Sequence, residues 1–376
     1  MKKILITGGA GFIGSNLSLS LIKKGYEVTV LDCLSAQIHG ENPEIESPLY
    51  LSLKNKVNFI NGSVTSYTDW GKALKDQDIV VHLAAETGTG QSMYEIKRYI
   101  DVNIGGTAAL LDFLTNNQHT IKKIVVASSR SIYGEGKYEH PELGVVYPSS
   151  RSEQDMLNGD FSVKYKGENV KLLATDEDSL LHPSSVYGIT KKFQEELVMT
   201  VCPTIGIAPV AFRYQNVFGP GQSLSNPYTG ILSIFSTQIL NGNGIKVFED
   251  GKESRDFVFI DDVVNATILG IEKEKANGHI FNVGAGMPTD VYTVAETLRQ
   301  LYKKDVSIEI TGNFRLGDIR HNYADLKKIE TLLGYKPSVT FVEGIKKFVE
   351  WVSKQTVQKD TLNESLAEMK KKGLFK

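Results

Sequence analysis

The stretch "KILITGGAGFIGSNL", residues 3–17, decides the fold of this chain. A short apolar run ends at Thr7, and Gly8, Gly11 and Gly14 follow it at the start of a helical pattern. Glycines here permit a tight strand-to-helix turn and let the backbone approach a diphosphate, whose charge the helix N-terminus attracts. A structural turn alone also calls for glycines, so the triplet needs support from its surroundings.

Asp32 provides that support, because it ends the second predicted strand about twenty residues later. A carboxylate at this place holds both hydroxyls of an adenine ribose and repels a 2′-phosphate, and no arginine follows nearby. The pattern therefore predicts NAD rather than NADP as the cofactor. A structural turn followed by an unrelated aspartate is the alternative.

Short apolar runs alternate with helical patterns through the first third of the chain. The strand candidates are "KILIT", "EVTVLD", "VNFING", "DIVVHLA" and "IKKIVVASS", with helices expected at 13–24 and 105–117. Buried strands that alternate with helices predict a doubly wound parallel sheet, an α/β fold of the Rossmann type. We expect this core over residues 1–134.

The alternation fails over residues 135–182, a long polar excursion in which "FSVKYKGENVKLL" favours a small hairpin. Residues 183–218 are expected to return to the core, with a helix at 185–200 and a strand in "PVAFRYQNVFG". Residues 219–353 are assigned mainly to a smaller, mixed, substrate-binding lobe with some segments returning to the core. An amphipathic helical tail is expected over residues 354–376.

The bulk composition excludes several classes of protein. The 376 residues exceed what one compact core usually holds, so two lobes are expected. A net charge of −2 gives no electrostatic footprint for nucleic acid. The two cysteines, Cys33 and Cys202, are too few for a disulfide framework or a cysteine-based metal site. Since the apolar runs are too short for a membrane span or a signal peptide, we expect a cytoplasmic protein without a membrane partner. We also expect no bound metal.

A tyrosine and a lysine lie four positions apart in "HPSSVYGITKKFQEELV", residues 182–198. On a helix, Tyr187 and Lys191 would face the same small volume. A nearby ammonium and an oxidised nicotinamide lower the pKa of a phenol, which is otherwise too high for a base at neutral pH. Ser128 and Ser129 end a predicted strand at the sheet edge where such folds bind ligands. Without these neighbours, the Tyr/Lys spacing would describe only a surface helix.

The motifs, taken in order, resemble those of the extended short-chain dehydrogenase/reductase family of nucleotide-sugar enzymes. They are TGGxGxxG, HLAA, VNxxGT, SSxSxYG, YxxxK, RYxNVxGPGQ and RDFVxxDD, and they cover nearly the whole chain. The resemblance implies a hydride-transfer site. In it Tyr187 is the base, Lys191 tunes that base and holds the nicotinamide ribose, Ser129 positions the substrate, and Ser128 is structural.

The resemblance also implies a set of residues around NAD. They are Gly8, Gly11, Phe12, Ile13, Gly14, Asp32, Ser63, Val64, Leu83, Ala84, Ala85, Asn103, Tyr187 and Lys191. Leu83, Ala84 and Ala85 are expected on the nicotinamide side with Asn103 beneath. Ser63 departs from the family, which usually has an aspartate at the adenine.

On the substrate side, the resemblance implies Ser129, Asn216, Arg255, Arg315 and Asp318. The planar forks of the two arginines suit a diphosphate, and Asp318 corresponds to a contact with the nucleotide ribose. A turn-stabilising role for Asn216 is the alternative.

Two further pairs of polar residues have structural interpretations. Asp261 and Asp262 are predicted to cap the helix that follows them. His82 and His321 are predicted to be packing residues.

The local sequence separates the reactions of this family. Sugar dehydratases usually carry an Asp–Glu pair after the catalytic threonine, and decarboxylases a glutamate beside the serine, whereas Arg130 and Ser131 follow Ser129 here. Epimerisation or keto-sugar reduction remains. The stretches "HLAAETGTGQSMYEIKRYIDVN", "GPGQSLSNPYTG", "FEDGKESRDFV" and "GDIRHNYAD", and the excursion, are similar to dTDP-L-rhamnose 4-epimerases.

The resemblance thus implies an NAD-dependent 4-epimerase acting through a 4-keto intermediate on a dTDP-linked 6-deoxyhexose. An epimerase of another nucleotide sugar, such as the UDP-glucose/galactose type, a keto-sugar reductase and a non-catalytic NAD-binding protein stay open. A homodimer is expected, because the helix of Tyr187 and the one near 92–115 commonly form the interface in relatives.

Overall fold

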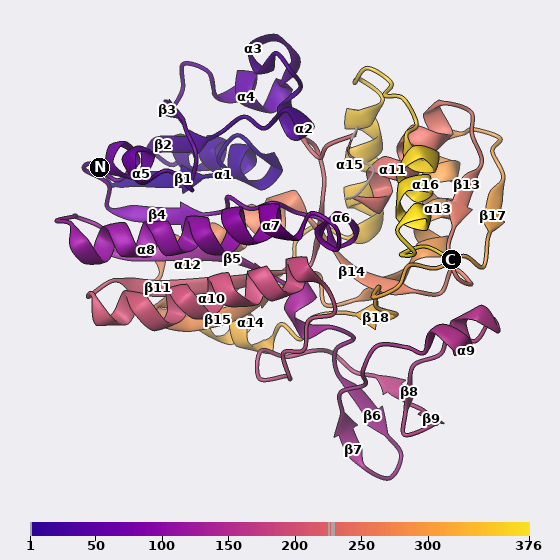
Figure 1. The fold of residues 1–376 in the computed structure, drawn as a ribbon. Helices are drawn as coiled ribbons and strands as arrows, with labels where there is room; N and C mark the ends of the chain where they lie inside the picture. Colours follow the sequence, from indigo (N-terminus) through magenta and orange to yellow (C-terminus); the bar gives the residue numbers. More distant parts are fainter. Residues whose placement is uncertain (1, 225, 227–229) are drawn as a thin grey trace.

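A seven-stranded sheet forms the core of the computed structural model, which describes residues 2–224, 226 and 230–376 (Figure 1). Its strands, in spatial order, are β15 (His279–Val283), β11 (Ala208–Tyr214), β5 (Lys123–Ser129), β4 (Ile79–His82), β1 (Lys3–Thr7), β2 (Glu27–Asp32) and β3 (Asn58–Asn61). All neighbouring pairs are parallel. The predicted doubly wound α/β fold is confirmed, and the strand order reverses between β1 and β4, where such sheets bind ligands.

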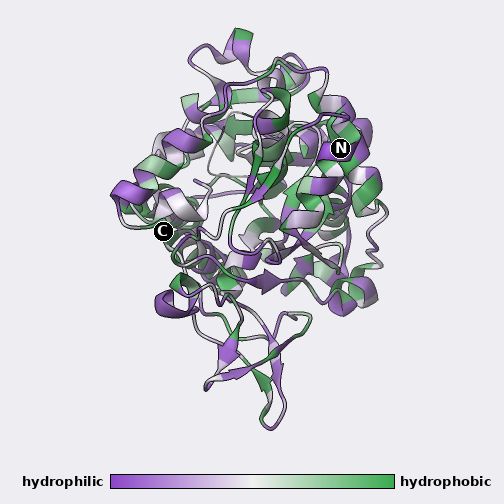
Figure 2. Ribbon diagram, turned by 90° about the vertical axis from the view of Figure 1, so that its right-hand side faces the viewer, coloured by the Kyte–Doolittle hydropathy of each residue, from purple (hydrophilic) through white to green (hydrophobic). Residues whose placement is uncertain are grey.

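Successive side chains of each strand point to opposite faces of the sheet, so two apolar layers form. Ile4 and Ile6 of β1 belong to the layer that packs α1 (Phe12–Lys23) and α12 (Ile260–Glu272). Leu5 belongs to the layer under α5 (Tyr67–Ala73), α8 (Gly106–Asn116) and α10 (Val186–Thr204). Figure 2 shows the apolar residues concentrated on the central strands.

The short elements that border the core follow β2 and β4. After β2 come α2 (Ala36–His39), α3 (Pro43–Glu46) and α4 (Pro48–Leu53). After β4 come α6 (Thr89–Ser92), α7 (Ile96–Tyr99) and a π-helix (Ile100–Gly105) that continues into α8.

The second lobe is mixed. It contains β12 (Asn216–Phe218), α11 (Ile231–Leu240), β13 (Ile245–Val247), β14 (Ser254–Phe259), β16 (Pro288–Asp290), α13 (Val291–Tyr302), β17 (Ile308–Ile310), β18 (His321–Asn322), α15 (Phe341–Val352) and α16 (Leu362–Lys371). Two elements of the same stretch, β15 and α14 (Lys327–Leu333), pack with the core sheet. The strand predicted within 209–219 is divided at Gln215, because β11 joins the large sheet and β12 pairs with β14.

The excursion projects from the body beside the second lobe (Figure 1). It holds the sheet of β6 (Tyr138–His140), β7 (Gly144–Val146) and β10 (Lys171–Leu172), together with α9 (Glu153–Leu157). The predicted hairpin forms between β8 (Lys164–Tyr165) and β9 (Glu168–Asn169).

Buried charges tie the excursion to the rest of the molecule. Arg213 of β11 bonds to the Glu195 carboxylate on α10, with Nη2 to Oε1 at 2.6 Å. The same guanidinium donates to the Tyr133 hydroxyl at 2.7 Å and to the Glu177 carbonyl of the excursion at 2.8 Å. Tyr133 in turn donates to Asn282 of β15 at 2.8 Å. One buried cation therefore connects the helix of Tyr187, the central sheet and the excursion.

The helix that was predicted to be capped by Asp261 and Asp262 begins differently. Its N-cap is Phe259, which makes no side-chain cap, and both aspartates lie in its first turn. The buried Asp262 carboxylate instead accepts hydrogen bonds from the backbone of Ser338 and Val339 and from the Ser338 hydroxyl. The capping prediction was wrong, since this carboxylate fixes a loop from another part of the chain.

No helix within residues 2–224, 226 and 230–376 is long and apolar enough to cross a membrane.

Candidate active site

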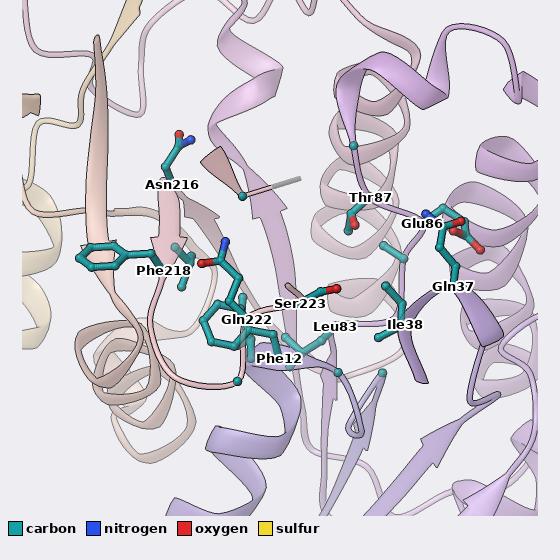
Figure 3. A pocket seen from close by; sticks show the side chains of 18 of the residues that line it. Phe12, Gln37, Ile38, Leu83, Glu86, Thr87, Asn216, Phe218, Gln222 and Ser223 are labelled. Atoms are coloured by element: carbon teal, nitrogen blue, oxygen red, sulfur yellow. The ribbon is translucent and has the colours of Figure 1, made fainter. Parts of the chain in front are cut away.

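A cavity of about 1030 Å³ lies at the carboxyl edge of the large sheet, between the core and the second lobe. Every predicted cofactor and substrate residue lines it except Asn103. Figure 3 shows Phe12 and Leu83 between two walls, one with Asn216 and Phe218 and the other with Glu86 and Gln37. Part of the predicted stretch "GPGQSLSNPYTG" lies outside the described residues.

The glycine turn has no room for side chains. Gly8 has a φ of +65°, and a Cβ on Gly14 would overlap the carbonyl oxygen of Gly8. The Asp32 carboxylate accepts backbone hydrogen bonds from Ala10 at 3.0 Å and from Leu34 at 2.9 Å. The turn and the acidic strand end therefore form one unit.

The cavity wall around Asp32 suits an unphosphorylated ribose. The lining residues between 31 and 40 include no lysine or arginine. His39 Nε2 lies 3.8 Å from the Asp32 carboxylate, and burial lowers the pKa of His39 despite that neighbour. Ser63 lines the cavity, and its hydroxyl bonds to the Thr65 hydroxyl at 2.8 Å.

Tyr187 and Ser129 line the same cavity, and their side chains lie close enough for the serine to influence the phenol. The Tyr187 backbone N–H donates to the Ser92 hydroxyl at 3.0 Å, which fixes the first turn of α10. The Ser131 hydroxyl donates to Ser129 Oγ at 2.9 Å. Burial raises the pKa of Tyr187, while the neighbouring Ser129 side chain and the charge of Arg130 lower it. The phenol and the serine thus share one buried site, as predicted.

Lys191 lies on the same helix, but its side chain bonds to another residue. Its Nζ donates to Gln194 Oε1 at 2.9 Å, and burial lowers its pKa to about 7 against the opposing charge of Glu195. Gln194 also donates to the Thr107 hydroxyl at 2.8 Å. His82 hydrogen-bonds with Thr107 at 3.0 Å, and burial lowers the pKa of His82 to about 3. His82 is therefore neutral and structural, in agreement with the prediction.

Asn103 stands behind the cavity wall in this structure. It is fully buried, and its side chain bonds to both backbone groups of Glu86, at 2.7 and 3.1 Å, and to the Thr190 hydroxyl of α10 at 2.9 Å. Asn103 therefore braces the loop after β4 against the helix of Tyr187.

On the substrate side, Arg255 is already paired. Its Nη2 donates to the Asp318 carboxylate at 3.0 Å and to the Ile319 carbonyl at 2.7 Å. The excursion supports the same loop, because Arg151 donates to the Asp318 carbonyl at 3.1 Å and forks onto the Glu249 carboxylate. His321, predicted to be a packing residue, bonds to the Ser254 hydroxyl at 2.8 Å beside this loop.

Arg315 is held by the C-terminal segment. Residues 314–316 pair antiparallel with residues 374–376 through three backbone hydrogen bonds of 3.0–3.1 Å. The Arg315 guanidinium lies over the Phe248 ring at 5.1 Å, and Phe375 contacts the same ring edge-on at 5.2 Å. The tail thus forms part of the wall around a predicted phosphate ligand.

The comparisons with known proteins agree with this geometry. Residues 4–152 and 165–284 match the NAD dependent epimerase/dehydratase family. The chain belongs to this family. It is 34% identical to a dTDP-L-rhamnose 4-epimerase of Burkholderia thailandensis, covering 96% of this chain and 97% of that protein. It is 30% identical to a putative UDP-glucose 4-epimerase of Methanocaldococcus jannaschii, covering 93% and 98%.

Two solved epimerases share the fold of this family member. A UDP-glucose 4-epimerase of Thermotoga maritima with UDP-glucose has a TM-score of 0.76 at 30% identity, covering 94% of this chain and 99% of that one. A UDP-glucuronic acid 4-epimerase of Bacillus cereus, in complex with UDP-glucuronic acid and NAD, also has a TM-score of 0.76, at 27% identity, with 93% and 99% covered. The predicted family, isomerase class and cofactor are confirmed.

The residues of this epimerase family member fit NAD. The turn at Gly8 and Gly14 is so closely packed that a Cβ would overlap neighbouring backbone, and a tight strand-to-helix turn of this kind is what a diphosphate site requires. Asp32 at the end of β2 suits the adenine ribose, and Leu83, Ala84 and Ala85 line the cavity after β4.

Three residues of the site had no role in the sequence analysis. Arg130 lines the cavity and donates from Nε to Asn216 Oδ1 at 2.9 Å. Gln194 holds Lys191, and Phe248 carries Arg315. The position of Arg130 directly after Ser129 could have indicated that it lies in the site. No sequence motif indicates the other two contacts. Phe248 and Arg315 come from separate parts of the chain, and the contact of Gln194 with Lys191 depends on their side-chain rotamers.

Proposed function

We propose that this protein is a nucleotide-sugar 4-epimerase that acts on dTDP-L-rhamnose and forms dTDP-6-deoxy-L-talose. The pair of Tyr187 and Ser129, which lie close together and line the same cavity as Lys191, carries the proposal. Such a pair can move a proton to and from one hydroxyl of a bound sugar. A non-catalytic NAD-binding protein has no need of this pair or of the arginines beside it.

The residues of the site divide the work of one reversible oxidation. Bound NAD supplies a reversible hydride acceptor at C4 of the sugar. Tyr187 accepts the proton of the C4 hydroxyl, and Ser129 donates a hydrogen bond to the C4 oxygen. The resulting 4-keto sugar turns within the cavity, and Tyr187 returns the proton when the other face has been reduced. Because the oxidation is reversed in each cycle, no external reductant is consumed.

The choice of dTDP-L-rhamnose rests on the relatives and on the local sequence. The Burkholderia protein that matches over 96% of this chain bears that name, whereas the solved relatives bind UDP sugars. The absence of an acidic residue beside Ser129 favours epimerisation over dehydration, because Arg130 occupies the next position.

The test is a panel of nucleotide sugars incubated with the purified protein and followed by NMR. It contains dTDP-L-rhamnose, UDP-glucose and UDP-glucuronic acid, and it is run first without NADH and then with NADH. A second sugar signal from dTDP-L-rhamnose supports the proposal. A second signal from a UDP sugar alone reassigns the substrate, and product that forms only when NADH is supplied identifies a reductase.

We also propose a homodimer that forms through α8 and α10, which lie side by side on one face of the sheet (Figure 1). Ile189 and Phe193 lie one turn apart on α10 and are 41% and 46% exposed. Ile96 and Ile100, before α8, are also exposed. Light scattering of the wild-type protein should give twice the mass of one chain. The Phe193→Arg variant should give the mass of a single chain. A monomeric wild-type protein at micromolar concentration would contradict the dimer.

A further inference from the structure

Arg130 is a charged side chain in the cavity that the carboxylates of Asp318 and Glu135 attract without forming an ion pair with it. It follows Ser129 at the end of β5, and within the described part of the chain its side chain makes one hydrogen bond, from Nε to Asn216 Oδ1 at 2.9 Å. None of the ion pairs of the described residues involves it. Burial lowers its pKa to about 10, so the guanidinium remains charged at neutral pH. Its terminal nitrogens are left to the cavity that it lines.

The two carboxylates that attract Arg130 have other partners, because Asp318 pairs with Arg255 and Glu135 accepts hydrogen bonds from the Arg320 backbone and the Tyr138 hydroxyl. Three arginines line the cavity, Arg130, Arg255 and Arg315, and the Asp318 carboxylate is paired with Arg255. Glu253 also lines the cavity, but burial raises its pKa to about 8 and leaves it mostly uncharged at neutral pH. A positive excess in a partly desolvated cavity is unfavourable until an anion enters it. The cavity is therefore built for an anionic group beyond its own carboxylates.

The hydrogen bond from Arg130 fixes the orientation of the Asn216 side-chain amide. The amide oxygen of Asn216 is occupied by Arg130, so its NH₂ group is turned away from Arg130 and has no partner among the described residues. Figure 3 shows the side chain of Asn216 at the edge of the cavity. The amide and the guanidinium thus offer donors and no acceptor on this side, which suits phosphate oxygens.

We propose that Arg130 is a third substrate-binding arginine, which holds the phosphate attached to the sugar and orients the Asn216 amide toward the same phosphate. The proposal rests on the proposed function in requiring a nucleoside diphosphate sugar. It deepens that function, because Arg130 lies between Asn216 and the pair of Ser129 and Tyr187. A phosphate fixed here is the pivot about which the 4-keto sugar turns.

A carboxylate on the sugar is the second anionic group that this fork could bind, and a uronic acid carries one. The two possible anions predict different binding results. If Arg130 binds the phosphate attached to the sugar, it should also contribute to the affinity for a nucleoside diphosphate that has no sugar. If it binds a sugar carboxylate, it should contribute to the affinity for a nucleotide uronic acid only.

The experiment measures the binding of dTMP, dTDP, UDP-glucose and UDP-glucuronic acid to the NAD-loaded protein by calorimetry, for wild type, Arg130→Met and Arg130→Lys. A charge-assisted hydrogen bond of this kind corresponds to a change of about 10- to 100-fold in affinity. We expect Arg130→Met to weaken dTDP by that factor while dTMP binding stays within about twofold of wild type. Arg130→Lys keeps the charge and loses the fork, so it should recover only part of the dTDP affinity. Arg299→Met, on a surface arginine paired with Glu296, is the matched control.

Three results would overturn the proposal. They are unchanged dTDP binding by both Arg130 variants, equal losses for dTMP and dTDP, and a loss confined to UDP-glucuronic acid relative to UDP-glucose. Should Arg130→Met not fold, shown by lost NAD and a lowered Tm, the Lys variant decides alone. Because these bindings require no turnover, they can succeed even if the NMR panel shows no epimer. Failure of the inference and failure of the proposed function are thereby distinguished.

Discussion

Lys191 donates to Gln194, one turn further along α10, at 2.9 Å, although Tyr187 lies one turn earlier on the same helix. Burial lowers the pKa of Lys191 to about 7. Gln194 holds the lysine side chain beside the cavity, and a bound cofactor ribose would offer it a second partner.

Lys191→Met should lower the NAD content of the purified protein and its turnover, because the buried ammonium is expected to bind the nicotinamide ribose. NAD is measured by chromatography after denaturation. Lys192→Met is the matched control, since Lys192 lies next in the chain and pairs with Glu196 at 3.7 Å on the surface. Full NAD occupancy and full activity in Lys191→Met would remove the role assigned to this lysine.

Tyr187→Phe should reduce turnover by about 10²- to 10⁴-fold, the usual contribution of general acid–base catalysis. It should leave bound NAD and Tm nearly unchanged, because the hydrogen bond that fixes the first turn of α10 comes from the Tyr187 backbone N–H, which the variant keeps. Tyr292→Phe, on a partly exposed tyrosine of α13, is the control. An active Phe variant would falsify the assignment of the base.

Gly14→Ala should abolish NAD binding or prevent folding, because the added Cβ would overlap the Gly8 carbonyl oxygen. At Gly105 a Cβ meets only the Ile100 carbonyl oxygen at 3.7 Å, so Gly105→Ala should be tolerated. NAD content and thermal melting report both variants. If Gly14→Ala binds NAD as wild type does, the close packing of the turn is not required.

The affinity for nucleotide sugars should fall as the pH rises through about 8. Burial raises the pKa of Glu253 to about 8, so this carboxyl is neutral below that pH and becomes an anion beside Arg255 and Arg315 above it. The anion repels a diphosphate, and the affinity then falls by up to about tenfold per pH unit.

Glu253→Gln should make the affinity nearly independent of pH between 7 and 9. Binding is measured in the Tyr187→Phe background, where the substrate is not turned over. A wild-type affinity that rises with pH contradicts the charge assigned to Glu253.

Phe375→Ala should raise KM for the nucleotide sugar and leave NAD content unchanged, because Phe375 and Arg315 contact the same Phe248 ring. The rise is expected to be about three- to tenfold, as for a loosened binding side chain rather than a removed one. Ile310→Ala, on an exposed residue of β17, is the control. An unchanged KM would show that the C-terminal segment does not position Arg315.

The structural features that the sequence predicted best are those that depend on short, local sequence patterns. The parallel core follows from buried β-branched runs between helices, and the glycine turn with Asp32 follows from short spacings. The sites of Tyr187 and Ser129 follow from the same logic, since both stand at the sheet edge. These features need no knowledge of distant contacts.

The features that sequence missed depend on contacts between distant segments. Asp262 resembles a helix cap, yet it binds the loop at Ser338 because the helix begins two residues earlier. Asn103 lies in a motif associated with the cofactor, yet it braces Glu86 against Thr190. The contacts among Arg315, Phe248 and Phe375 join three separate segments of the chain, and no periodic sequence pattern predicts them.

The salt bridge of Arg213 with Glu195 has a consequence for anyone who redesigns this enzyme. Arg213 also donates to the Glu177 carbonyl, so shortening the excursion would remove a partner of the buried cation on β11 that pairs with Glu195 of the helix bearing Tyr187. The excursion is therefore not an interchangeable module. A chimaera with a relative that lacks it would require compensating changes at Arg213 and Glu195 before any transplanted specificity could be judged.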